Sequence, residues 1–453
     1  MKKTIMILVA MALVLGLPQC KKQTTGVLEG TVDITLDVSA NKSSRIIVDP
    51  ASGDVAFEQN DMVYVGSGGK FVGTLTCRGT SFKGQITDAT LGEPLYFFFL
   101  GNKTPAETLT AGTSTSCSVV ISDQTSKLPV ISFAISDQDF SGKGNYTAFF
   151  LNKAALVKFD VNTPSTATTS ILGMNNKVTV SFADNSFGYG QDGEGVITLA
   201  AGNGEHWAIL LPQNAVNEAF AKSDYDDFYI GSCGAIPAIG VNDYLTDGIP
   251  VTLSLSNCYV DLGLPSGLLW AICNVGAYKP EAYGSYFAWG ETQPKDSYLF
   301  ANYRHCFSYD GDLTKYCNNY QMGYQSYTDN LTVLQAEDDA ATANWGSGWR
   351  MPTKSDWEEL LANTTISSVN QNGVNGRLFT ATNGNTLFLP GGGYRFGDNK
   401  SYQEYAYCYY WSSTLYNDDP RLAYDSRFGS SNNGISSEWR CFGMLVRPVR
   451  AAN

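Results

Sequence analysis

Histidine is nearly absent from this chain of 453 residues, and charged residues of either sign are sparse. The sequence holds only two histidines, His206 and His305, and charged residues make up 16% of the composition. Catalytic triads and most zinc sites depend on histidine, so the composition argues against a Ser-His-Asp or Cys-His enzyme and against a histidine-rich metal site. We therefore expect no enzymatic activity, no catalytic residue, no cofactor and no bound metal.

The chain also lacks a basic stripe. Its formal net charge is −13, and the acidic residues are spread along the whole length. A nucleic-acid-binding surface needs clustered lysine and arginine to displace counterions from the phosphates. The charge balance therefore excludes nucleic acid as a partner, and the acidity is best explained as an aid to solubility.

No apolar stretch after the first twenty residues is long enough to span a bilayer. Lys2 and Lys3 precede an uncharged run over residues 5–17, which is short for a membrane span and suits the apolar core of a signal peptide. Residues 17–20 (LPQC) then resemble a lipobox, in which the cysteine is acylated. The resemblance predicts a signal peptide over residues 1–20 and a membrane anchor through acyl chains on Cys20. An ordinary cleaved signal with an incidental cysteine is the alternative.

Cysteine is more plentiful, with ten residues in all. Export permits disulfides, and without Cys20 nine cysteines remain (10 − 1), so at least one thiol stays unpaired or pairs between chains. Cys306 and Cys317 are candidates to close one loop, and Cys408 and Cys441 are candidates for a second bridge. Alternatively, most of the cysteines are small buried apolar side chains.

Aromatic residues reach 13% and glycines number 45, a composition typical of β-sandwiches with tight turns. Alternation over residues 32–38 predicts a strand with one face on a core, and the apolar run 95–100 predicts a fully buried strand. A polar stretch, 136–145, is predicted to be a linker. Further strands are predicted over 149–161, 178–182, 207–211 and 251–255. The chain is therefore mainly β, with one β domain over 27–140 and a second over 145–256.

Three segments of this half, with the lipoprotein start, carry a family resemblance: residues 57–65 (FEQNDMVYV), 154–159 (AALVKF) and 207–213 (WAILLPQ). They resemble the fimbrillin-like family of Bacteroidetes pilins and adhesins. The resemblance implies two transthyretin-like β-sandwiches, and subunits that polymerise by strand insertion after an arginine-specific protease cuts behind the first strand. Arg45 sits where such a cut would fall, and the released strand would leave a groove for a partner strand. A solvated arginine in a polar loop is the alternative.

From Cys258 onward the composition changes, and seven of the eight tryptophans follow residue 265. The following segments succeed one another: 260–271 (VDLGLPSGLLWA), 286–292 (YFAWGET), 349–353 (WRMPT), 410–414 (YWSST) and 446–450 (VRPVR). Together they resemble the Fibrobacter succinogenes major paralogous domain, which is related in fold to C-type-lectin-like domains and to formylglycine-generating enzymes. The resemblance implies an α+β domain over 258–453, with two helices flanking curled antiparallel sheets and long loops on one side.

Two short helices are predicted in this last part. Residues 334–345 are alanine-rich, with acidic residues in the first turns that favour the helix dipole. A second helix is predicted after Pro352, with Thr353 or Ser355 as its N-cap and Asp356 or Glu358 three residues further on.

Sugars are held without a metal by aromatic faces and planar hydrogen-bonding groups, and the C-terminal strands offer both. The candidate ligand-binding residues are Tyr409, Tyr416, Asp418, Asp419, Arg421, Asn432, Asn433, Glu438 and Trp439. Alternation sends every second strand residue inward, and we expect Trp411 in the core and Trp439 at the surface. Residues 417–420 (NDDP) offer oxygen ligands for calcium, but a solvated turn is the preferred interpretation.

These features predict a lipid-anchored adhesin of the cell outer membrane, exposed at the cell surface or in a fimbrium. Its C-terminal domain would bind a glycan or a host or bacterial surface protein, and it would contact other fimbrial subunits by strand insertion as a tip or accessory subunit. Two alternatives belong to other classes. One is a formylglycine-generating-like modifying enzyme in the C-terminal domain, and the other is a purely structural pilin subunit.

Overall fold

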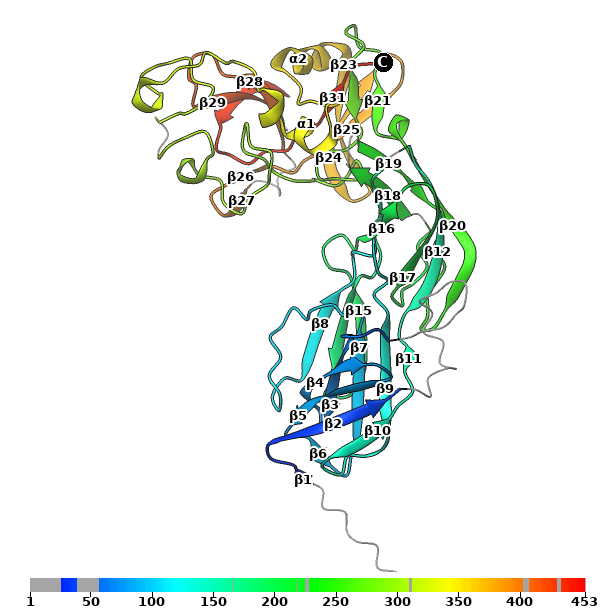
Figure 1. Cartoon of the computed structure of the whole chain (residues 1–453). Helices are drawn as coiled ribbons and strands as arrows, with labels where there is room; N and C mark the ends of the chain where they lie inside the picture. Colours follow the sequence, from blue (N-terminus) through cyan, green and yellow to red (C-terminus); the bar gives the residue numbers. More distant parts are fainter. Residues whose placement is uncertain are drawn as a thin grey trace, which may run out of the picture.

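The computed structural model describes residues 26–38, 57–164, 166–217, 219–224, 228–308, 312–401, 407–429 and 433–452. Cys20, Arg45 and Asn432 lie outside these residues. The chain is mainly β, with 48% strand and 7% helix. Two β units and a C-terminal head, residues 258–452, follow one another along an elongated molecule (Figure 1).

An eight-stranded sheet forms the base of the first unit. Its strands are β2 (Thr31–Asp37), β3 (Met62–Ser67), β4 (Lys70–Arg78), β5 (Ser81–Thr87), β7 (Pro94–Leu100), β9 (Ile131–Asp139), β10 (Gly144–Thr147) and β11 (Leu151–Asn152), in the order β10-β2-β5-β4-β3-β7-β9-β11. A short pair, β1 (Gly26–Val27) and β6 (Thr90–Leu91), lies beside it. The strands predicted over 32–38 and 95–100 are confirmed as β2 and β7, because alternation in β2 buries Ile34 and Leu36 while most of β7 is buried.

A three-stranded sheet covers one face of this base. It consists of β8 (Ser116–Val120), β14 (Lys177–Ser181) and β15 (Ser186–Gly190), in the order β15-β14-β8. Phe182, just after β14, packs on Phe98 and Phe71 of the base at ring-centroid distances of 5.3 and 5.7 Å. The three-stranded sheet on the first unit therefore includes a hairpin from residues predicted to belong to the second unit.

The sequence predicted a linker over 136–145, and this prediction is wrong because most of the stretch is strand. β9 continues to Asp139, and β10 begins at Gly144 and pairs in parallel with β2. Strand pairing thus crosses the expected boundary between the two β units. The division into 27–140 and 145–256 stays a prediction.

The second unit is a seven-stranded sheet in the order β16-β13-β18-β19-β20-β12-β17. Its strands are β12 (Ala155–Asn162), β13 (Thr168–Ile171), β16 (Ile197–Ala201), β17 (Gly204–Leu210), β18 (Ala219–Asp224), β19 (Phe228–Cys233) and β20 (Tyr244–Ser254). They confirm strands in the regions predicted near 149–161, 207–211 and 251–255. One continuous apolar core runs through both units, from Ile34 to Leu253.

The head combines short antiparallel sheets with two α-helices. The sheets are β21 (Tyr259–Asp261), β22 (Leu269–Ala271) with β31 (Val449–Arg450); β23 (Thr364–Gln371), β24 (Val374–Ala381) with β25 (Thr386–Pro390); β26 (Tyr394–Phe396) with β27 (Asn399–Ser401); and β28 (Cys408–Leu415), β29 (Leu422–Phe428) with β30 (Asn433–Trp439). Because β31 pairs with β22, the C-terminal strand closes the head on itself. Short 3-10 turns are η1 (Leu255–Asn257), η2 (Phe300–Asn302) and η3 (Tyr324–Ser326). No helix in the described part of the chain is long and apolar enough to cross a membrane.

The two helices differ in how well the sequence predicted them. α2 (Lys354–Asn363) starts as expected, because the Thr353 side chain accepts from the Asp356 backbone N–H in a capping box. The helix predicted over 334–345 is shorter. Asp339 accepts from backbone N–H groups and caps α1 (Ala340–Trp345), which leaves only a 3-10 turn, η4 (Ala336–Asp338), before it.

Side chains of the second unit lie inside the core of the head. Phe228, at the start of β19, stacks on Trp345 with ring centroids 3.9 Å apart and an interplanar angle of 9°. Phe228 and Ile230 are only 1% and 4% exposed. The Cys258 thiol donates to the Phe228 carbonyl and accepts from the Ile230 N–H, both at 3.2 Å. The junction is therefore packed like a domain interior and holds the two parts in one arrangement.

Truncation of Phe228 should destabilise the whole protein. Phe228→Ala leaves a cavity against Trp345 and is expected to lower the free energy of unfolding by about 3–5 kcal/mol. Thermal or urea unfolding measures the change. Phe149→Ala, which truncates a phenylalanine that is 52% exposed, is the matched control and should change stability by less than about 1 kcal/mol. Equal effects of the two substitutions would contradict a shared core.

Candidate functional site

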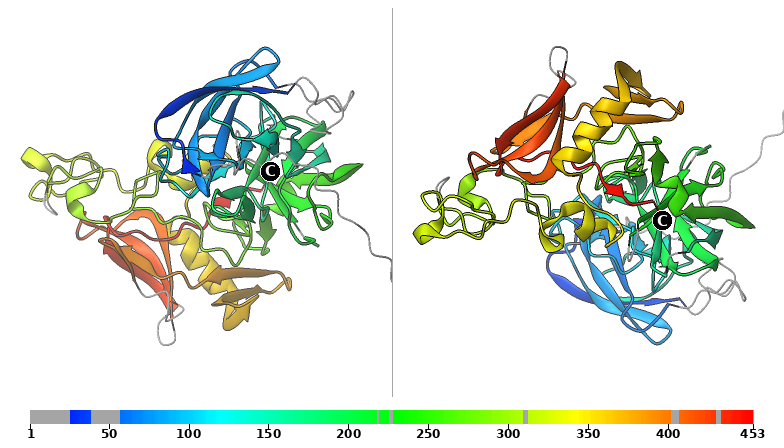
Figure 2. Two further views of the ribbon diagram at one scale, coloured as in Figure 1. Left: turned by 90° about the horizontal axis from the view of Figure 1, so that it is seen from below. Right: turned by 90° about the horizontal axis from the view of Figure 1, so that it is seen from above.

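The loops between β22 and α1 form a lobe that projects from the head, away from the second unit (yellow-green in Figures 1 and 2). We call its described residues within 303–330 the aromatic lobe. Phe307 is 64% exposed, Tyr320 is 62% exposed and Tyr327 is 38% exposed. Tyr324 stacks on Phe307, with ring centroids 4.1 Å apart. Several large aromatic rings of the lobe are therefore exposed to solvent on one loop region.

A buried arginine fastens this lobe to the rest of the head. Arg440 donates to the Tyr303 hydroxyl at 2.9 Å, to the Tyr316 and Lys315 carbonyls at 3.0 Å and to the Pro420 carbonyl at 2.8 Å. None of these four partners is a carboxylate, so the guanidinium donates mainly to backbone carbonyls of the loops. The lobe and the turn at Pro420 therefore share one anchor.

Two carboxylates accept hydrogen bonds from backbone and side-chain groups of the lobe. Asp329 accepts from the backbone N–H groups of Tyr316 at 2.7 Å and Cys317 at 2.9 Å. Asp338 accepts from the Lys315 ammonium at 2.6 Å and from the Tyr316 hydroxyl at 2.7 Å. These hydrogen bonds fix the loops that carry the exposed rings. Such preorganisation lowers the entropic cost of binding a partner.

His305 lies in the interior of the head. Its ring is buried, with Nε2 2.9 Å from the Gly290 carbonyl oxygen and 3.7 Å from Asp338 Oδ1. Burial lowers the pKa of His305 to about 4, so the ring is neutral near pH 7. Within the described residues, no group of three or more His, Cys, Asp and Glu side chains is arranged to hold a metal ion.

The ligand residues predicted from the sequence fall into two separate groups. The first lies at the turn before β29, next to the lobe. Both Asp419 carboxylate oxygens accept from Arg421, at 2.7–3.2 Å, and the Arg421 guanidinium lies 5.2 Å from the Trp439 ring centroid. Phe300 contacts Trp439 edge-on at 5.5 Å. Trp439 is therefore half-buried between two neighbours, and not freely exposed as expected.

The same turn carries Tyr416 and Asp418 beside the lobe. Tyr416 contacts the Tyr424 ring at 5.2 Å, and a hydrogen bond to Asp418 raises the pKa of Tyr416. The Asn318 amide of the lobe donates to the Asn417 carbonyl at 3.1 Å. The turn and the lobe therefore form one continuous surface, and the lobe rings on it were not among the predicted residues.

The second group lies on one face of the β28-β29-β30 sheet. Arg427 donates to Asp425 at 2.7 Å and to Glu438 at 3.0 Å, and its guanidinium lies 5.3 Å from the Tyr409 ring centroid. Asn433 is exposed at the start of β30. Burial raises the pKa of Asp425 to about 6, although the ion pair with Arg427 opposes the shift. Sequence reasoning missed Asp425 and Arg427, which alternation along β29 places on one face.

Neither predicted disulfide is present. Cys317, Cys408 and Cys441 carry free thiols, so neither the Cys306–Cys317 nor the Cys408–Cys441 bridge forms. The Cys317 thiol donates to the Asn319 carbonyl at 3.1 Å, and the Cys408 thiol donates to the Leu389 carbonyl at 3.4 Å. Burial raises the pKa of Cys408 and of Cys441 to about 12. These cysteines are small buried side chains with local acceptors.

Comparison with known proteins finds similarity at the level of solved structures only. No family model matches the chain, and no curated protein matches it. A protein from Bacteroides ovatus assigned to cell adhesion is 13% identical with a TM-score of 0.31, over 50% of this chain and 96% of that one. The fimbrial anchor protein Mfa2 from Porphyromonas gingivalis is 10% identical with a TM-score of 0.24, over 42% of this chain and 76% of its own. A fimbrial protein from Bacteroides ovatus is 13% identical with a TM-score of 0.21, over 95% and 100%. At TM-scores below 0.5, these similarities do not by themselves assign a function.

The buried carboxyl of Asp425 should make stability depend on pH. Its pKa is raised on folding from 3.8 to about 6, so its contribution is fully present below pH 4 and is lost as the pH rises through 6. Relative to Asp425→Asn, the wild-type protein should therefore lose about 3 kcal/mol between pH 4 and pH 7. Urea unfolding of both proteins at several pH values measures this difference. Asn433→Ala, which removes no titrating group, is the control, and a difference between wild type and Asp425→Asn that does not vary with pH would contradict the burial argument.

Proposed function

We propose that this protein is an adhesin of the bacterial cell envelope that binds a glycan or a surface protein through the aromatic lobe of its head. The observation that carries the proposal is the exposure of Phe307, Tyr320 and Tyr327 on loops held by Arg440 and Asp329. Exposed aromatic rings are unfavourable in water, and sugars and protein surfaces both bind to such rings by stacking and apolar contact.

The two alternative functions fit the geometry less well. An enzyme of the formylglycine-generating kind would need reactive cysteines or a free carboxylate pair. Asp425 and Glu438 do approach each other, but Arg427 lies between them and binds both. Burial holds the Cys408 and Cys441 thiols in the protonated form. A purely structural pilin subunit would cover the lobe rings with neighbouring subunits, which the binding experiment distinguishes.

The fold proposal follows the same division of the chain. We assign the two β units to transthyretin-like sandwiches and the head to the C-type-lectin-like fold. The three-stranded sheet packed on the eight-stranded one supports the first assignment. In the head, two helices lie among short antiparallel sheets, and β31 pairs with β22, which brings the two ends of the head together. Both features support the second assignment.

The position of the first strands supports an anchor at the opposite end from the lobe. β1 lies at the far end of the molecule from the head (Figure 1). A lipid on Cys20 would therefore hold the protein at the outer membrane and present the aromatic lobe away from it. In this arrangement the protein acts at the cell surface, alone or as part of a fimbrium.

The topology of β2 supports assembly with other fimbrial subunits by strand insertion. β2 pairs with β5 over all its seven residues and with β10 over four. A cut at Arg45 would free this strand, and its loss would expose the ladder edges of β5 and β10 and the core sites of Ile34 and Leu36. Because β31 is paired inside the head, the protein would accept a strand but not donate its C-terminal one, which fits a tip or accessory subunit.

Removal of the lobe rings should abolish binding without unfolding the head. Phe307→Ala and Tyr320→Ala in the full chain are each expected to weaken binding to hits from a glycan array or a surface-protein screen by at least tenfold. The control is Phe149→Ala, because Phe149 is 52% exposed but belongs to the first unit. If the wild-type protein has no hit, or if the lobe variants bind as well as wild type, this proposal is wrong.

Cleavage and strand exchange give a separate test. An arginine-specific protease should cut the native protein after Arg45, and Arg45→Lys should prevent that cut. A synthetic peptide with the sequence of residues 26–38 should then bind the cleaved protein but not the intact one, because only cleavage allows β2 to leave. Mass spectrometry and native gels measure both events. If the cleaved protein excludes the peptide and forms no complex with other subunits, assembly by exchange of β2 is contradicted.

A further inference from the structure

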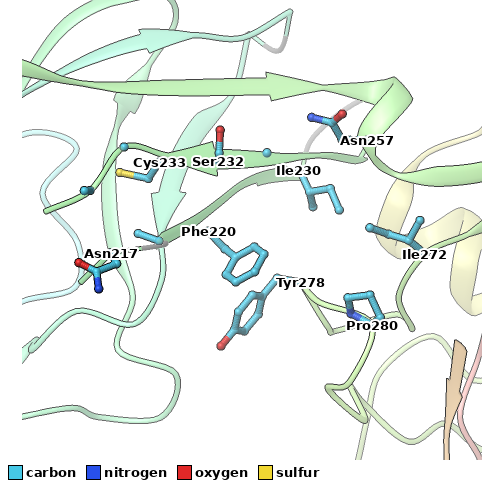
Figure 3. Close-up of a pocket in the computed structure, with 13 residues that line it drawn as sticks. Asn217, Phe220, Ile230, Ser232, Cys233, Asn257, Ile272, Tyr278 and Pro280 are labelled. Atoms are coloured by element: carbon cyan, nitrogen blue, oxygen red, sulfur yellow. The ribbon is translucent and has the colours of Figure 1, made fainter. Parts of the chain in front are cut away.

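A groove lies where the second unit meets the head (Figure 3), and none of the residues that line it belongs to the aromatic lobe. Residues of β18 and β19 form one wall, and Ile272, Tyr278 and Pro280 of the head form the other. Its volume is about 520 Å³, within the range of about 300–1,000 Å³ that small-molecule sites occupy. Because Phe228 is locked in the head core, both walls are fixed and the groove is preformed.

Two aromatic rings, one from each part of the molecule, lie side by side in this groove. Phe220 of β18 and Tyr278 of the head have ring centroids 5.7 Å apart and an interplanar angle of 57° (Figure 3). Phe220 is 38% exposed, and Ile230 lies near it in the same wall. The rings offer an apolar surface that a flat, C–H-bearing ligand face would cover.

Four polar side chains of the groove have no hydrogen-bond partner among the residues that the structure describes. In the described part of the chain, no hydrogen bond involves the side chains of Asn217, Ser232 and Asn257 or the Tyr278 hydroxyl. Each amide both donates and accepts, and each hydroxyl does the same. Burial, and to a smaller extent Glu194, raises the pKa of Tyr278, so its hydroxyl stays protonated and remains a donor. These groups therefore keep their hydrogen-bonding capacity for solvent or a ligand.

No formal charge lines the groove. Among the described residues that form it, there is no Asp, Glu, Lys, Arg or His. Two charged groups adjoin the lining: the Lys279 ammonium lies 5.8 Å from the Tyr278 ring centroid, and Glu194 raises the pKa of Tyr278. Their charges have opposite signs and interact with each other, so a charged ligand would lose hydration without meeting an unopposed counter-charge. A purely apolar ligand would leave the amides unpaired. A neutral sugar satisfies both requirements, because its C–H face stacks on aromatic rings and its hydroxyl groups both donate and accept.

We propose that this groove is a second binding site, distinct from the aromatic lobe, and that it binds an uncharged saccharide about two rings long. Phe220 and Tyr278 provide the stacking surface. Asn217 and Asn257, at opposite ends of the groove (Figure 3), bind the hydroxyl groups. The site exists only in the assembled chain, since each part supplies one of the two rings.

The experiment uses the full chain and three neutral disaccharides, cellobiose, maltose and lactose, together with a uronic-acid disaccharide. Isothermal titration calorimetry up to about 10 mM ligand detects affinities down to the millimolar range. At least one neutral disaccharide should bind, and the acidic one should not. Phe220→Ala should weaken binding by at least tenfold, and Tyr278→Phe, which keeps the ring but removes the hydroxyl, should weaken it about fivefold.

Two further variants separate this site from its surroundings. Tyr244→Ala truncates an exposed aromatic residue of the second unit outside the groove and should leave the affinity unchanged. Phe307→Ala should likewise leave the affinity for the disaccharide unchanged. Loss of binding at the lobe and loss of binding at the groove can therefore be told apart. The proposal is wrong if none of the neutral disaccharides binds. It is also wrong if Phe220→Ala and Tyr278→Phe, tested separately, both bind as tightly as the wild type.

Discussion

The contact on which the arrangement of the whole molecule depends is the stack of Phe228 on Trp345. A side chain from the second unit packs in the core of the head, and the Cys258 thiol donates to the Phe228 carbonyl and accepts from the Ile230 N–H. A linker would let the head swing, whereas a shared core couples the two parts energetically. The direction in which the aromatic lobe points and the presence of the groove beneath the head both follow from this packing.

Polar interactions in the head serve mainly to position loops. Arg440 is buried and bonds to three carbonyls and one tyrosine hydroxyl, and Asp329 bonds to successive backbone N–H groups. A loop whose backbone groups are satisfied internally can expose large rings without collapsing onto them. His305, which lies near Asp338, is likewise enclosed, and its burial keeps the ring neutral near pH 7.

The two proposed surfaces differ in the chemistry they offer. The aromatic lobe exposes rings beside an acidic turn at the far end of the molecule, and a large partner can reach it. The groove is lined by uncharged side chains, is preformed and has a limited volume, so the proposed ligand there is a short segment of sugar. A protein held at its first strands would thus present one surface to a distant partner and keep a second one along its side.

The local features of the fold could be predicted from the sequence alone. Alternation located β2 and the apolar run located β7, while the capping residues located the start of α2, because each depends on residues a few positions apart. Burial of Trp411 also followed from its position in a strand. The contacts between segments that are distant in the sequence could not be predicted and became known from the folded structure. The β14–β15 hairpin packs on the first unit, Phe228 packs in the head, and the predicted ligand residues separate into two groups. Sheet register and the packing of loops over long sequence separations decide these features, and periodicity along the chain carries no information about them.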